Sequence, residues 1–161
     1  MQVNQHKASS RSNAGFTLIE MMVAMVMVAV LASIAIPSYR SYIRRAQLSD
    51  AFSTLADLRV KMEQYYQDNK FYGADAASTG CPALPNTSAF PFSTKNFKFE
   101  CSANGGAAPL QVYLLTATGI SGATTGYAYS LNQQGIKGTV TFDGASSGQS
   151  CWLTRAGECD N

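Results

Sequence analysis

The sequence predicts an α+β fold in which one long N-terminal helix packs on an antiparallel sheet of roughly four strands. Apolar residues recur at spacings of three and four in the first part of the chain, as on one face of a helix. Short alternating segments separated by turn residues follow in the second part, as in a sheet. The helix is predicted to have a membrane half and an amphipathic half. With 161 residues, the chain is long enough for one globular domain.

Residues 1–15 are interpreted as a leader peptide. They are polar, contain Lys7 and Arg11 but no acidic residue, and end in Gly15. The apolar stretch follows this small residue instead of preceding it, which reverses the order of an ordinary secretory signal. Cleavage after residue 15 would therefore leave a chain anchored by its new N-terminus.

Residues 16–36 are predicted to form a transmembrane and assembly helix, and residues 37–161 a globular head. The apolar run spans about 31 Å as a helix, enough to cross a bilayer core. A plain signal anchor would have the same length. Glu20 is its only charge, and a carboxylate costs about 2.5–3.5 kcal/mol at the bilayer centre. Two interpretations of Glu20 stay open: pairing with a terminal ammonium, its own or a neighbour's, or solvation near the interface.

The head is expected to include the amphipathic half of the helix. Pro37 should kink the helix, after which the helical period resumes. The apolar stripe consists of Leu48, Ala51, Phe52, Leu55, Leu58, Met62, Tyr65 and Tyr66. The polar side is expected to form ion pairs between Asp57 and Lys61 and between Arg59 and Glu63.

Three arginines, Arg40, Arg44 and Arg45, follow the apolar run directly. Basic residues usually mark the cytoplasmic side of a membrane span, and here the leader already supplies them. We interpret the three arginines as solvated or in contact with another subunit.

After the helix, which should end near residues 68–69, the chain is expected to form a loop and then an antiparallel meander. The segment 73–93 is rich in loop-forming residues. Strands are expected around residues 97–100, 110–118, 127–131 and 140–142, with a turn at 133–135. The tail from Asp143 to Asn161 contains the only tryptophan, Trp152, which we expect to pack against the sheet in preference to an exposed contact.

Four cysteines, Cys81, Cys101, Cys151 and Cys159, predict two disulfides. All four follow the apolar segment, in a part of the chain expected to be exported. Three pairings are possible by arithmetic, and we favour the sequential one, Cys81–Cys101 and Cys151–Cys159. A zinc site is the alternative, but the cysteines lack the close spacing that such a site needs.

The composition argues against an enzyme. The only histidine, His6, lies in the leader, so a mature chain would lack His-based acid–base catalysis and His metal ligands. We expect no cofactor and no metal. Without Lys7 and Arg11, the 12 basic residues fall to 10, equal to the 10 acidic residues. A neutral chain does not favour general nucleic-acid binding.

The segment GFTLIE at residues 15–20, followed by the apolar run and Pro37, resembles the N-terminus of type IV prepilins. The resemblance implies a pilin fold, cleavage after Gly15 by a membrane aspartyl peptidase, and N-methylation of Phe16. It gives Glu20 the role of an assembly carboxylate. The implied partners are other pilin subunits, the prepilin peptidase, the pilus assembly machinery, and the inner membrane before assembly.

Later segments resemble minor pilins of the PilE type, some of which are grouped with DNA-uptake pilins. They are Ala46-Gln47, residues 65–69 and the C-terminal cysteine loop. The resemblance implies a structural subunit of a type IV pilus. Before assembly the chain would cross the inner membrane once, with its head in the periplasm, and after assembly it would be extracellular.

Two alternative functions remain open. A DNA receptor in natural transformation would need basic residues gathered on the head, and the available ones are Lys70, Lys95, Lys98, Lys137 and Arg155. A type II secretion pseudopilin shares the same N-terminus, although the cysteine-bounded tail favours a pilin. The sequence leaves open whether the pilus serves adhesion, twitching motility or DNA uptake.

Overall fold

A computed structural model describes residues 15–74, 80–103 and 111–160. The chain divides into two compact units, one ending at Tyr39 and the other beginning at Arg40. Helix α1 (Leu18–Asn69) has 52 residues and contains Pro37. It ends where the sequence predicts, whereas a kink at Pro37 stays a prediction. Residues 1–14 of the predicted leader lie outside the described residues.

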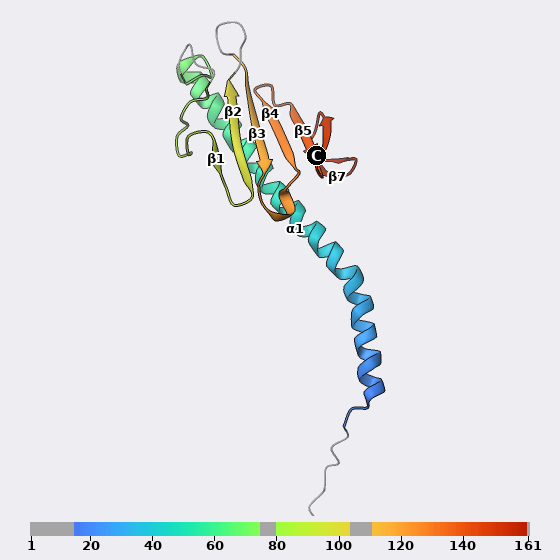
Figure 1. Ribbon diagram of the computed structural model, residues 1–161. Helices are drawn as coiled ribbons and strands as arrows, with labels where there is room; N and C mark the ends of the chain where they lie inside the picture. Colours follow the sequence, from blue (N-terminus) through green and yellow to red (C-terminus); the bar gives the residue numbers. More distant parts are fainter. Residues whose placement is uncertain (1–14, 75–79, 104–110, 161) are drawn as a thin grey trace, which may run out of the picture. The chain divides into compact units, whose positions relative to one another are not determined.

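Six strands form one antiparallel meander, in which strands adjacent in sequence are adjacent in the sheet. They are β1 (Phe92–Ser93), β2 (Phe97–Ala103), β3 (Tyr113–Gly119), β4 (Ala128–Asn132), β5 (Lys137–Phe142) and β6 (Ala145–Gln149). The short helix η1 (Gly122–Thr124) lies between β3 and β4. A separate hairpin consists of β7 (Leu153–Arg155) and β8 (Glu158–Cys159). Figure 1 shows the second half of α1 running behind the meander.

The second half of α1 packs on one face of the sheet through the predicted apolar stripe. Its residues from Leu48 to Met62 share one core cluster with apolar residues of β2, β3 and β4, and Tyr65 and Tyr66 pack against that cluster. Burial alternates along the strands: Leu115 is fully buried, whereas its neighbour Leu114 is 47% exposed. The predicted α+β fold is therefore confirmed.

The sheet has more strands than the roughly four predicted. Strands β2 to β5 match the predicted segments, although Leu110 lies outside the described residues and β3 begins at Tyr113. Strand β6 shows no apolar alternation and forms because Asp143 and Gly144 turn the chain, with φ angles of 53° and 81°. Asp-Gly between two strands is the sequence signal for this kind of hairpin.

One of the two predicted ion pairs forms. Lys61 lies 2.9 Å from Asp57, but the described residues contain no ion pair between Arg59 and Glu63. Glu63 instead accepts a hydrogen bond from the hydroxyl of Tyr72 at 3.1 Å. Burial, together with this bond, raises the pKa of Tyr72 to about 12. The carboxylate is thus used to hold the chain that follows α1.

Candidate functional site

Gly15 and Phe16 lie in an exposed, non-helical stretch directly before α1. The Phe16 side chain is 80% exposed. A Cβ atom placed on Gly15 would meet no atom within 4 Å. The peptide bond between these two residues is therefore accessible from solvent in the first unit.

Thr17 and Glu20 form a capping box at the start of α1. The Thr17 N–H and the Thr17 hydroxyl each donate to Oε2 of Glu20 at 2.8 Å. In return, the Glu20 N–H donates to Oγ1 of Thr17 at 3.3 Å. This arrangement satisfies backbone donors that a helix start otherwise leaves without partners. The spacing T-x-x-E is visible in the sequence, and it is a known signal of a helix start.

The capping box gives Glu20 hydrogen bonds to Thr17, a partner that neither interpretation from the sequence included. Both bonds to the carboxylate use Oε2, so within the described residues Oε1 stays open to another donor. The partial positive charge of a helix N-terminus also favours a carboxylate here. Glu20 is therefore held about one turn from Phe16, where a cut would place an ammonium.

Residues 21–36 of α1 carry many exposed, large apolar side chains. Met25, Leu31 and Ile34 are 77%, 68% and 70% exposed. The hydroxyl of Ser33 donates to the carbonyl of Val30 at 2.7 Å, so this polar group is satisfied within the helix. Helix α1 is long and apolar enough to cross a membrane. Exposed apolar surface of this extent needs lipid or other apolar helices around it.

The structure joins Cys81 to Cys101 and Cys151 to Cys159, which is the sequential pairing. The first disulfide ties the segment after α1 to β2, across a separation of 20 residues. A closed loop of this size stabilises a fold by about 3 kcal/mol in the chain-entropy view. The second disulfide bounds residues 151–159, named here the C-terminal loop, which contains the β7–β8 hairpin.

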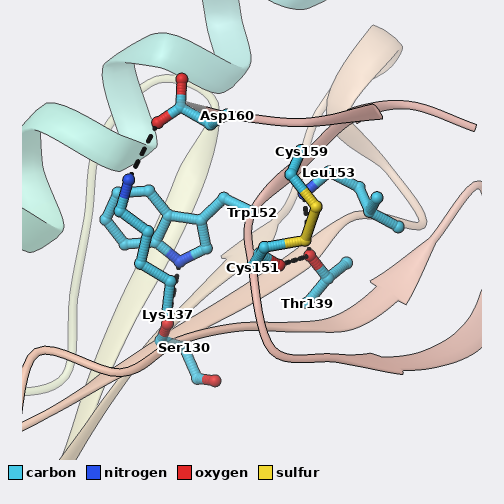
Figure 2. Close-up of polar contacts among 8 residues, drawn as sticks. All are labelled: Ser130, Lys137, Thr139, Cys151, Trp152, Leu153, Cys159 and Asp160. Atoms are coloured by element: carbon cyan, nitrogen blue, oxygen red, sulfur yellow. Dashed lines mark hydrogen bonds and ion pairs between the residues drawn. A yellow bond between two sulfur atoms is a disulfide. The ribbon is translucent and has the colours of Figure 1, made fainter. Parts of the chain in front are cut away.

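Trp152 anchors the C-terminal loop to the core. Its ring stacks on Phe52 of α1 with 4.7 Å between ring centres, and its Nε1 donates to the carbonyl of Ser130 at 2.9 Å. The Nζ of Lys137 lies 4.7 Å from the centre of the Trp152 ring (Figure 2). Trp152 is 4% exposed, so the prediction that it packs against the sheet is confirmed.

Thr139 of β5 holds the backbone of the same loop. Its hydroxyl donates to the carbonyl of Cys151 and accepts the N–H of Leu153 at 2.9 Å. Figure 2 shows both bonds beside the Cys151–Cys159 disulfide. Thr139 is 1% exposed. No sequence signal identifies it, because threonine is common on either face of a strand.

Replacing Trp152 with alanine is expected to lower the free energy of unfolding by about 3–5 kcal/mol, the usual cost of emptying a buried aromatic site. The change also leaves the Ser130 carbonyl without its donor. Urea unfolding followed by near-UV circular dichroism would measure the loss. Ile136→Ala serves as the control because Ile136 is 51% exposed. A loss for Trp152→Ala no larger than for the control would contradict the anchoring role.

The basic residues suggested for nucleic-acid contact are mostly paired with acids. The pairs are Lys98–Glu100 at 2.7 Å, Lys137–Asp160 at 3.3 Å and Arg155–Glu158 at 3.2 Å. Lys70 and Lys95 are exposed and form no ion pair within the described part of the chain. Strands β2 and β5, which carry Lys98 and Lys137, are separated by three strand spacings, roughly 14 Å. The described residues therefore do not place all five cations in one cluster.

Two sequence families match the chain. The family described as "Type IV minor pilin ComP, DNA uptake sequence receptor" matches residues 37–130. The family described as "Prokaryotic N-terminal methylation motif" matches residues 10–36. Together the two matches include Gly15 and Phe16, all of α1 and the sheet as far as the first residues of β4.

Curated relatives of the chain are fimbrial proteins. Fimbrial protein EcpC of Eikenella corrodens is 39% identical over 72 residues, which is 45% of this chain and 47% of the relative. A fimbrial protein of Moraxella nonliquefaciens is 40% identical over 68 residues, 41% of this chain and 44% of the relative. Type IV major fimbrial protein FimA of Dichelobacter nodosus is 40% identical over 62 residues, 38% of this chain and 39% of the relative. The matched region thus spans less than half the length of each relative.

Proposed function

Because this chain belongs to the family of the type IV minor pilin ComP, we propose that it is a subunit of a type IV pilus. The observation that carries the proposal is the exposed apolar surface of residues 16–36, which precedes a head with a closed core. A bilayer covers this surface before assembly, and the helices of neighbouring subunits cover it afterwards. Before assembly the head lies in the periplasm, and in the pilus it is extracellular.

Maturation of the subunit begins with removal of residues 1–15. The prepilin peptidase cuts the bond between Gly15 and Phe16 and N-methylates Phe16. The accessibility of this bond and the match to a methylation motif over residues 10–36 support this step. Methylation keeps the positive charge on the new terminus.

Glu20 guides assembly through the ammonium of a neighbouring subunit. The capping box fixes the carboxylate, and Oε1 faces no donor within the described residues. In a low-dielectric bundle, attraction between carboxylate and ammonium depends strongly on distance, so it can set the axial register of packed helices. The pilus assembly machinery brings the two subunits together.

The proposal is tested on filaments sheared from cells that carry the gene. The filament fraction should contain the chain, and mass spectrometry should identify an N-terminal peptide that starts at N-methylated Phe16. Detection of only the uncut chain, confined to the membrane fraction, would refute the proposal.

A second candidate function is that the head binds DNA as an uptake receptor. The specific observation in its favour is the match over residues 37–130 to a family described as a DNA uptake sequence receptor. Lys70 and Lys95 are the cations best placed to reach phosphates, since they are exposed and form no ion pair among the described residues.

A gel-shift assay with the purified full chain in detergent tests DNA binding. Lys70→Gln/Lys95→Gln is expected to weaken binding and to reduce the slope of log affinity against log salt by about 2, close to one for each phosphate contact. Scrambled DNA of equal length controls for sequence preference. Unchanged affinity and slope in the double variant would exclude these lysines, and no shift at low salt would exclude the receptor function.

A further inference from the structure

The segment Arg40–Arg45, named here the juxtamembrane belt, carries positive charge that forms no ion pair within the described residues. It follows the apolar run, which ends at Ile36, and contains three arginines. Between Glu20 and Asp50 the chain contains no acidic residue. Within residues 15–74, 80–103 and 111–160, the ion pairs join other side chains.

The three arginines differ in their contacts with the rest of the head. The guanidinium carbon of Arg44 lies 5.7 Å from the centre of the Tyr127 ring, so Arg44 contributes to the head itself. Arg40 is exposed and Arg45 is half-buried, and neither has a ring contact or ion pair among the described residues. Tyr42, between them in sequence, is 64% exposed. Arg40, Tyr42 and Arg45 are therefore available to a partner outside the head.

The belt begins at the depth of a headgroup layer. Arg40 follows Ile36 by four residues, about 6 Å along a helix axis, and the polar layer of one leaflet is roughly 5–8 Å thick. Helical side chains lean toward the N-terminus of their helix, which here is the membrane side. The long stem of Arg45 can therefore carry its guanidinium back toward the lipid. A tyrosine such as Tyr42 is a residue typical of this interface.

From these observations we propose that Arg40 and Arg45 bind the phosphate groups of anionic phospholipids while the chain is in the membrane. The inference rests on the proposed membrane insertion before assembly. Basic residues are usually sparse on the translocated side of a span, so two unpaired arginines there need a counter-charge. The planar guanidinium can donate two parallel hydrogen bonds to one phosphate. This contact replaces solvation as the interpretation of Arg40 and Arg45.

The test uses the full chain reconstituted in phosphatidylcholine vesicles that contain spin-labelled phosphatidylglycerol or spin-labelled phosphatidylcholine. The fraction of each label immobilised by the protein gives its lipid preference. Arg40→Gln/Arg45→Gln is expected to lower the preference for phosphatidylglycerol about thirtyfold, equivalent to about 2 kcal/mol at about 1 kcal/mol for each arginine. Arg40→Lys/Arg45→Lys should keep most of the preference for phosphatidylglycerol. In the unsubstituted chain, 1 M salt should weaken this preference, because the Debye screening length is only about 3 Å at that concentration.

Lys70→Gln/Lys95→Gln is the matched control because it removes the same charge from exposed positions outside the belt. This variant should keep the preference. A preference that survives Arg40→Gln/Arg45→Gln, or that falls equally in the control, would overturn the inference. Flotation of the vesicles distinguishes the two proposals: a chain that floats but shows no preference refutes only the belt, whereas a chain that does not float refutes membrane insertion as well.

Discussion

Replacing Gly15 with valine is expected to slow processing by at least about 100-fold, the effect that a small misplacement at a catalytic site can have. The protein itself tolerates the added side chain, since a Cβ on Gly15 meets no atom within 4 Å. The expected decrease in processing rate therefore arises in the active site of the peptidase, where a glycine lets the substrate backbone approach the catalytic groups closely. Immunoblots that resolve precursor from mature chain would measure it.

Leu18→Val is the control for the processing prediction. It introduces the same β-branched side chain three residues later, at a position that is 78% exposed, and should be processed at the normal rate. Both variants should form the two disulfides, which lie in the other unit of the chain. Normal amounts of mature chain from Gly15→Val would show that the cut lies elsewhere.

Replacing Glu20 with alanine is expected to leave processing intact but to reduce incorporation into filaments at least about tenfold. Removing one member of a buried ion pair typically costs about 3–5 kcal/mol, because the other charge stays buried without a partner. In the filament, that other charge would be the ammonium of a neighbouring Phe16. The measurement is the ratio of this subunit in sheared filaments to that in the membrane fraction.

Glu20→Gln separates the charge from the capping box. A glutamine oxygen can still accept the N–H of Thr17, since the capping box accommodates either residue, but it cannot attract an ammonium as a carboxylate does. If charge pairing directs assembly, Glu20→Gln should fail as Glu20→Ala does. If Glu20→Gln assembles normally while Glu20→Ala does not, helix capping alone would explain the requirement, and the pairing proposal would be wrong.

The sequence anticipated the elements whose signals are local. The stripe from Leu48 to Met62 repeats with the helical period, and the structure buries it because one helix face meets the sheet. The alternation around Tyr129 likewise predicted a strand with one buried face. Strand β6 was not predicted because its sequence, ASSGQ, is polar; the Asp143-Gly144 turn is the sequence feature that could have indicated it.

In the candidate site, too, some parts have a local sequence signal and others do not. The proposed cleavage site, Gly15-Phe16, and the T-x-x-E box lie within six consecutive residues, 15–20, so both can be identified from sequence order. The C-terminal loop cannot, because Trp152 meets Phe52 and Lys137 across long stretches of chain. The anchoring of this loop depends on which surfaces pack together in the fold, and no periodic pattern in the sequence predicts that packing.

By itself, the sequence determined the long helix, the apolar segment that needs lipid or neighbouring helices, and the family to which the chain belongs. These properties depend on residues close together in the chain, where spacing alone decides which side chains share a face. Only the tertiary structure decided that Thr139 holds the C-terminal loop and that Lys137 is paired with Asp160. Charges and hydroxyls acquire such partners through folding, because their bonds extend over only about 3 Å and depend on final positions.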